Sequence, residues 1–255
     1  MSGSWKPVLL QSLNVAVFAV TVIVNGLASS LALNGVTTAE ISDRYFTLVT
    51  PAGYVFSIWG VIYTLLLLFA VFQALPNQRE KPFQEQISVL FILSGILNVA
   101  WLFLWHYDQI VLSVALMFAL LATLIAIYLR LGIGKTTVPW KERAFVHLPF
   151  SVYLGWITVA SIANVASALV STGWDGFGLA DATWAVLVII VALLITLIVI
   201  ATRKDAAYSL VLVWALVGIA VNQSSHQNIV TAATASAVTI LVALAAVLAW
   251  SKLKK

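Results

Sequence analysis

Eight long apolar segments, separated by short polar connections, restrict this chain of 255 residues to a membrane-embedded fold. A helix needs about 20 apolar residues to cross the hydrocarbon core, and in lipid it must satisfy its backbone hydrogen bonds internally. Hydrophobic residues make up 62% of the chain, more than a soluble domain of this size can bury. The expected spans are 8–33, 53–75, 86–106, 109–129, 145–171, 182–202, 206–222 and 229–250. We therefore predict an all-α membrane bundle of about eight transmembrane helices.

The basic residues fall almost entirely on one side of these spans. Of the 13 Lys and Arg residues, twelve precede the first span, follow an even-numbered span or close the chain, and only Arg44 lies on the other side. Because basic loops stay in the cytoplasm, this distribution predicts a multi-pass protein of the cell (inner) membrane with both termini cytoplasmic. The formal charge of +4 thus follows from topology and does not indicate nucleic-acid binding.

Several kinds of chemistry lack the residues that they need. The nine acidic residues lie in loops or at span ends, and no Lys or Arg lies in the middle of a span. Ion-coupled transporters usually carry intramembrane charges, and a retinal protein needs a lysine deep in a helix. Cysteine is absent, and we find no phosphate-binding loop, metal-binding cluster or Ser-His-Asp arrangement. We predict no catalytic residue, no metal site and no required cofactor, and an enzyme is the less favoured class.

Asparagine and tryptophan are the notable residues inside the spans. Four asparagines lie in the halves of their spans distant from the basic ends, namely Asn25, Asn98, Asn164 and Asn222. Four tryptophans lie well inside their spans, namely Trp59, Trp101, Trp156 and Trp214. Buried amides often form interhelical hydrogen bonds worth about 0.6 kcal/mol on average. Amides at similar depth, with aromatic walls, also fit a shared cavity for a flat hydrophobic molecule. Both interpretations stay open.

Three motifs occur in order on separate spans. They are TPAGYVFSIWGVIY at 50–63, LNVAW at 97–101 and YLGWITVASIAN at 153–164. Together they resemble the second-, third- and fifth-helix motifs of the TspO/translocator protein family, also called tryptophan-rich sensory proteins, over roughly residues 8 to 171. The resemblance implies a TspO-like five-helix membrane domain at 1–171, and a three-helix C-terminal membrane extension would follow at 172–255.

In that family, five helices surround a pocket for porphyrins, sterols and synthetic aromatic ligands, and the long first loop lies over the pocket. By motif, the resemblance implies that seven residues bind the ligand: Trp59, Tyr63, Asn98, Trp101, Tyr153, Trp156 and Asn164. The loop 34–52 is long enough to form a structure of its own, and loops of this length in compact structures are usually functional. We expect an ordered lid that includes Glu40, Asp43, Arg44, Tyr45 and Phe46.

The C-terminal extension contains segments that are similar in sequence to earlier spans. ALLATLIAIYLR at 119–130 recurs as ALLITLIVIATR at 192–203, and WITVASIAN at 156–164 is echoed by WALVGIAVN at 214–222. Apolar segments also repeat by chance, so a partial duplication and coincidence are both open. If the duplication is real, Trp214 and Asn222 belong to a second copy of the fifth-helix motif.

The favoured function is an integral membrane receptor or sensor that binds a flat hydrophobic ligand, a tetrapyrrole (porphyrin or haem) or a sterol-like molecule, in an intramembrane aromatic pocket. The alternatives are a transporter, a light-dependent porphyrin-degrading enzyme, and a structural membrane subunit whose aromatics only pack. His106, Asp108 and His226 are further candidates, because they lie on the lid side and could contact a porphyrin edge or a haem iron. The expected partners are membrane lipids and the ligand, and a homodimer is left open.

Overall fold

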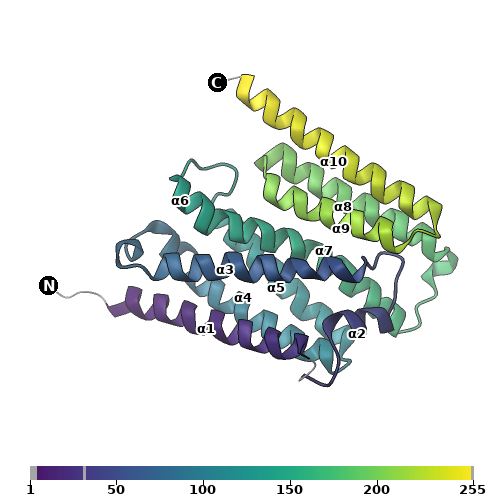
Figure 1. Ribbon diagram of the computed structural model, residues 1–255, viewed down its shortest axis with the longest axis horizontal. Helices are drawn as coiled ribbons and strands as arrows, with labels where there is room; N and C mark the ends of the chain where they lie inside the picture. The colour runs from purple at the N-terminus through teal and green to yellow at the C-terminus, as the bar shows by residue number, and fades with distance from the viewer. Residues whose placement is uncertain (1–4, 31–32, 254–255) are drawn as a thin grey trace.

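The computed structural model describes residues 5–30 and 33–253, and these residues form helices and turns without any strand. Figure 1 shows a bundle of long, roughly parallel or antiparallel helices. The long helices are α1 (Trp5–Ser29), α3 (Ile58–Ala74), α4 (Pro82–His106), α5 (Ile110–Arg130), α7 (Leu148–Ser171), α8 (Asp181–Arg203), α9 (Ala206–Asn222) and α10 (Gln227–Leu253). The short ones are α2 (Thr38–Arg44), α6 (Trp140–Glu142), η1 (Gly53–Ser57), η2 (Pro76–Gln78), η3 (Arg143–His147) and η4 (Gly176–Gly178). The predicted all-α membrane bundle is confirmed.

Seven stretches of helix in the described chain are long and apolar enough to cross a membrane by length and composition. The apolar helix α9 has 17 residues, which at 1.5 Å per residue span about 25 Å. It coincides with the predicted segment 206–222, the shortest of the eight. The chain is therefore a multi-pass integral membrane protein.

Two spans begin four or five residues earlier than the hydrophobicity predicts, and a proline is involved each time. The helix α4 begins at Pro82 instead of 86, since a proline fits the first helical turn, where its missing N–H has no partner to lose. The fifth span begins at Trp140 instead of 145. There Pro149 cannot donate to the carbonyl of residue 145, and the π-helical turn η3 lets the helix continue.

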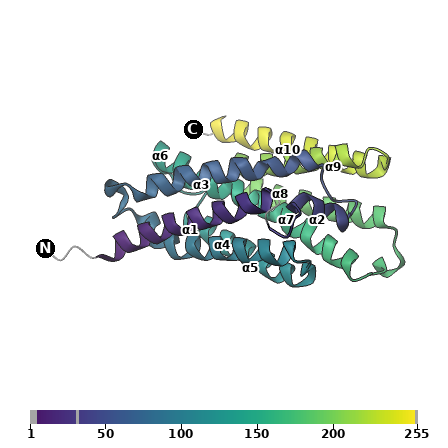
Figure 2. The ribbon, with the colours of Figure 1, turned by 60° about the horizontal axis from the view of Figure 1, so that its bottom comes forward.

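The two termini lie at the same end of the bundle in Figures 1 and 2, which we call the terminal end. The opposite end, which we call the lid end, carries α2 and the α4–α5, α7–α8 and α9–α10 connections. This arrangement agrees with eight passes, because an even number of crossings returns the chain to its starting side.

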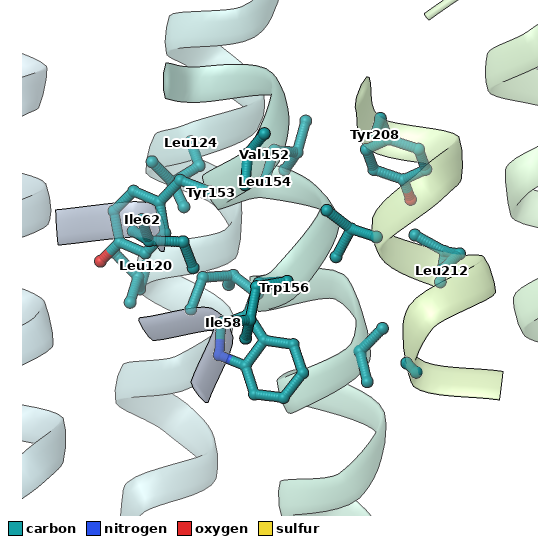
Figure 3. Packing of buried hydrophobic residues seen from close by; sticks show 14 of the residues in the cluster. Ile58, Ile62, Leu120, Leu124, Val152, Tyr153, Leu154, Trp156, Tyr208 and Leu212 are labelled. Atoms are coloured by element: carbon teal, nitrogen blue, oxygen red, sulfur yellow. The ribbon is translucent and has the colours of Figure 1, made fainter. Parts of the chain in front are cut away.

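The helices form two layers that meet along α7 and α9. The first layer contains α1, α3, α4, α5 and α7, while α8 and α10 pack against α9 in the second. Gly155 allows α7 to approach α9 closely, since a Cβ atom there would lie 3.1 Å from the Tyr208 carbonyl oxygen. Figure 3 shows α7 in the middle of this core, with Ile58 and Ile62 of α3 on one side and Tyr208 of α9 on the other.

Candidate functional site

An aromatic cluster joins α3 to α7 inside the five-helix layer. Trp59 stacks on Tyr63, one turn along α3, with ring centroids 5.5 Å apart. From α7, the rings of Tyr153 and Trp156 meet Trp59 edge-on at 6.2 Å and 6.0 Å. Edge-to-face and offset arrangements at these separations are the favourable ones for aromatic rings. Four residues of the predicted binding site therefore lie in direct contact.

The remaining three predicted residues connect to this cluster through hydrogen bonds. The Asn98 amide on α4 donates to the Tyr153 hydroxyl at 3.1 Å and accepts from Asn25 of α1 at 2.9 Å. The Trp101 indole N–H donates to the Asn164 side-chain oxygen at 2.8 Å, and Asn164 donates to Ser113 of α5 at 2.9 Å. These bonds tie α1, α4, α5 and α7 together. The sequence left open whether the buried asparagines form interhelical hydrogen bonds. The structure contains such bonds.

A small cavity of about 40 Å³ lies between the cluster and the lid. Its lining combines three of the predicted tryptophans with lid and helix residues: Thr38, Ser42, Pro51, Phe56, Trp59, Trp101, Trp105, Trp156, Val159, Ala160, Ala163 and Asn164. The sequence analysis missed Thr38 and Ser42, although their spacing of four residues places both on one face of a short helix. A cavity of this size holds about one water molecule, whose share of liquid volume is about 30 Å³.

Two buried polar atoms in the cluster stand out among the described residues. The Trp156 indole nitrogen and the Tyr63 hydroxyl oxygen are shielded from solvent and have no aligned hydrogen-bond partner there. Trp156 as a whole is only 2% exposed. Buried polar groups are almost always paired, and leaving one unpaired costs about 1–3 kcal/mol. The cluster therefore contains two buried polar atoms without a hydrogen-bond partner among the described residues.

The predicted lid is ordered around the short helix α2. Thr37 caps it by accepting from the Glu40 N–H, while the Glu40 carboxylate accepts from the Thr37 N–H at 2.7 Å and from its hydroxyl at 2.9 Å. These hydrogen bonds to Thr37, the backbone one first, hold the pKa of Glu40 below its usual value. Glu40 thus stabilises the lid helix, whereas Asp43 and Phe46 are exposed.

Polar contacts fasten α2 to the turn between α4 and α5. Arg44 forms an ion pair with Asp108, and the Tyr45 hydroxyl donates to the same carboxylate at 3.3 Å. Partial burial and then the Asp108 charge raise the pKa of Tyr45 above its usual value. The Trp105 indole N–H donates to the Thr38 carbonyl at 3.1 Å, which closes α2 over the cavity.

The other half of the lid loop is fastened to α9 of the second layer. The Asn222 amide donates to the Thr50 carbonyl at 3.0 Å, and the Trp214 indole N–H donates to the Val55 carbonyl at 3.2 Å. The Ala52 N–H donates to the Gly218 carbonyl at 3.1 Å. Trp214 and Asn222 therefore bind the backbone of 50–55 and do not line the cavity beneath the lid.

The three outlying candidates lie apart from the cavity lining. His106 is fully buried, its Nδ1 lies 2.9 Å from the Leu102 carbonyl oxygen, and its Nε2 lacks a partner among the described residues. Asp108 pairs with Arg44, and His226 is exposed on the α9–α10 connection. The structure does not bring these three side chains together with the aromatic cluster.

Comparison with protein families gives one match. Residues 11–248 match a family model described as TSPO-like protein. No curated protein and no solved structure matches the chain. The family match extends through α8, α9 and most of α10, beyond residues 8 to 171, over which the three motifs are recognisable.

Proposed function

The chain belongs to the TSPO-like protein family, and from that premise we propose that it is an integral membrane receptor for a flat hydrophobic ligand. The ligand class is a tetrapyrrole or a sterol-like molecule. One observation carries the proposal: the buried Trp156 indole N–H, unpaired among the described residues, lies in an aromatic cluster directly beneath the lid.

The chemistry of the cluster fits such a ligand. Ligand sites are mostly apolar and aromatic, with a few polar groups that fix orientation. Trp59 and Trp156 offer two rings at 84° to each other, which make a corner that a planar molecule can contact with its face and its edge. The unpaired Trp156 N–H needs an acceptor, and a porphyrin carboxylate or a sterol hydroxyl supplies one.

Binding requires the lid to move. The cavity of about 40 Å³ is far smaller than the roughly 300–1,000 Å³ of typical ligand pockets. The two halves of the lid loop are held differently. An exposed ion pair and the Trp105–Thr38 hydrogen bond secure α2, whereas Trp214, Asn222 and the Gly218 carbonyl of α9 hold the backbone of 50–55. Exposed ion pairs contribute only about 0–1 kcal/mol. We therefore propose that α2 swings open while 50–55 stays fixed.

The basic residues give the proposed orientation. Among the described residues, ten of the eleven Lys and Arg residues belong to segments at the terminal end, and Arg44 is at the lid end. By the positive-inside rule, the terminal end faces the cytoplasm, and the lid opens to the outside of the cell membrane. Reporter fusions after Arg79, Arg203 and the C-terminus test this, because all three should report a cytoplasmic location.

The test of ligand binding is a fluorescence titration of the purified protein with porphyrins and sterols. A bound porphyrin should quench a large share of the tryptophan emission. Trp59→Leu and Trp156→Leu should each weaken binding by about 1–3 kcal/mol, as expected for buried aromatic anchors. Trp140→Leu is the control, because Trp140 is 69% exposed at the terminal end.

The packing alternative gives the opposite pattern. If the cluster only packs, the two Leu variants lose stability and no member of the ligand panel quenches the wild type. Equal affinities in wild type, Trp59→Leu and Trp156→Leu, with all proteins folded, would place the ligand elsewhere in the bundle.

A further inference from the structure

A groove much larger than the cavity beneath the lid lies between α7 and α8. Its volume is about 730 Å³. Phe118 and Leu121 of α5 and the segment 46–49 complete its walls. The groove exists because α8 packs mainly against α9 and α10, leaving a gap beside α7. None of the seven residues of the proposed ligand site lines it.

The groove has the length and character of a lipid chain site. Its α7 wall runs from Thr158 to Val170 and its α8 wall from Asp181 to Ile195, lengths of about 18 Å and 21 Å at 1.5 Å per residue. It therefore extends from the lid end past the middle of a hydrocarbon core about 30 Å thick. The Thr158 and Ser161 hydroxyls donate to carbonyls of their own helix, at 2.9 Å and 2.7 Å, so the deep part offers no free donor.

The mouth of the groove at the lid end has a different chemistry. Asp181, His226, Trp174 and Trp184 line it there. The Trp184 N–H donates to the Gly176 carbonyl at 2.8 Å, which fixes the ring, and Trp174 lies 5.1 Å from it between centroids. A carboxylate beside fixed indole rings is a favourable environment for an ammonium group.

The charged residues of the lid end also favour an ammonium group. Its described acidic groups are Glu40, Asp43, Asp108, Asp175 and Asp181. Arg44 is the one Lys or Arg among the described residues at this end, and it is paired with Asp108. An anionic headgroup would thus meet repulsion at the mouth, whereas a headgroup that ends in an ammonium would be attracted.

We propose that the groove binds one phospholipid from the leaflet at the lid end, with an acyl chain between α7 and α8. The ammonium of its headgroup lies beside Asp181 and the indoles of Trp174 and Trp184. The acyl chain contacts the segment 46–49, which precedes the part of the lid loop held by α9. This site is separate from the aromatic cluster and does not depend on what that cluster binds.

Native mass spectrometry of the delipidated full-length protein tests the proposal. The probes are phosphatidylethanolamine and phosphatidylglycerol with identical acyl chains. The wild type should retain one phosphatidylethanolamine, with a preference of about fivefold over phosphatidylglycerol. Ala166→Trp, which fills the groove, should abolish retention. Ala235→Trp is the matched control, since Ala235 is exposed on α10 and does not line the groove.

Two further variants separate the headgroup from the chain and guard against misfolding. Asp181→Asn should lose the preference between the two lipids, while Asp43→Asn, which removes a lid-end carboxylate outside the groove, should keep it. Val170→Trp fills the groove at a residue that is already 48% exposed, so it blocks the chain without overpacking the core. Wild-type retention by both folded groove-filling variants would overturn the site. Equal retention of the two lipids by the wild type would overturn the ammonium contact.

Discussion

The helices α7 and α9 carry the same pair of residues at the same spacing and use it differently. In α7, Trp156 is 2% exposed in the aromatic cluster, and Asn164 bonds to side chains of α4 and α5. In α9, Trp214 is 38% exposed, and both it and Asn222 donate to main-chain carbonyls of the segment 50–55. The neighbours of a helix therefore decide whether a tryptophan–asparagine pair packs within the bundle or holds a loop.

The difference follows from where each helix lies. Helix α7 has α3 and α5 of its own layer and α9 of the other layer as neighbours, so its tryptophan meets other rings. Helix α9 faces the segment 50–55, which leads into the helical turn η1, and its side chains donate to the Thr50 and Val55 carbonyls. Backbone groups away from water must find partners, and side-chain N–H groups from a rigid helix supply them.

Replacing each of the two tryptophans with alanine tests this difference most directly. Trp156→Ala should lower the free energy of unfolding by about 3–5 kcal/mol, because it leaves a large cavity in the core. Trp214→Ala should lower it by about 1 kcal/mol, as is usual for partly exposed positions. Denaturation of the purified proteins in detergent measures both values. Equal losses would mean that the two tryptophans are equally structural.

Replacing Asn164, the asparagine of the α7 pair, should give the next largest loss of stability. Asn164→Ala removes the acceptor of the Trp101 N–H and a partner of Ser113 at a buried position. It should lower the free energy of unfolding by about 1–3 kcal/mol, the cost of leaving buried groups unpaired. The double variant Trp101→Phe with Asn164→Ala should recover part of that loss, since the orphaned N–H is then absent. No recovery in this double-mutant cycle would argue against the hydrogen bond as the cause.

Much of the fold, and the grouping of the seven predicted residues, follows from the sequence for identifiable reasons. Apolar length alone locates the spans, since lipid forces each one to be helical. The motif spacing places Asn98 and Trp101 one turn apart on α4, and the structure connects both to α7. Ligand binding by these residues remains a prediction.

Other features could not be predicted because they depend on backbone geometry. The acceptors of Trp214 and Asn222 are the carbonyls of Val55 and Thr50, and a carbonyl is present at every position of the sequence. The groove between α7 and α8 depends on which neighbour α8 packs against, and its apolar lining looks like that of any lipid-facing helix. Three-dimensional packing alone distinguishes these features.

The role of α9 in holding the lid loop leads to a smaller, local prediction. Asn222→Ala removes the hydrogen bond to Thr50 and should leave the global unfolding free energy nearly unchanged. Hydrogen exchange at the Ala52 N–H, which is bonded to Gly218, should become faster by about fivefold, as expected for the loss of about 1 kcal/mol of local stability. Asn228→Ala serves as the control, because Asn228 lies on the next helix and its side-chain oxygen accepts from the neighbouring Ile229 N–H. An unchanged exchange rate at the Ala52 N–H in Asn222→Ala would show that α9 does not anchor this segment.

The smallest effect is expected at the other half of the lid. Arg44→Gln removes the ion pair with Asp108, and an exposed pair of this kind contributes about 0–1 kcal/mol. Stability should therefore change little, but the proposed opening of α2 should become easier, so that a bound porphyrin dissociates up to about fivefold faster. Salt should have a matching effect in the wild type only, because screening weakens an ion pair that the variant lacks. Asp43→Asn removes a neighbouring charge that is not part of the Arg44–Asp108 ion pair and should keep the wild-type rate. Equal dissociation rates in Arg44→Gln and wild type at low salt would show that α2 is not the moving part, and the opening would then have to involve the contacts with α9.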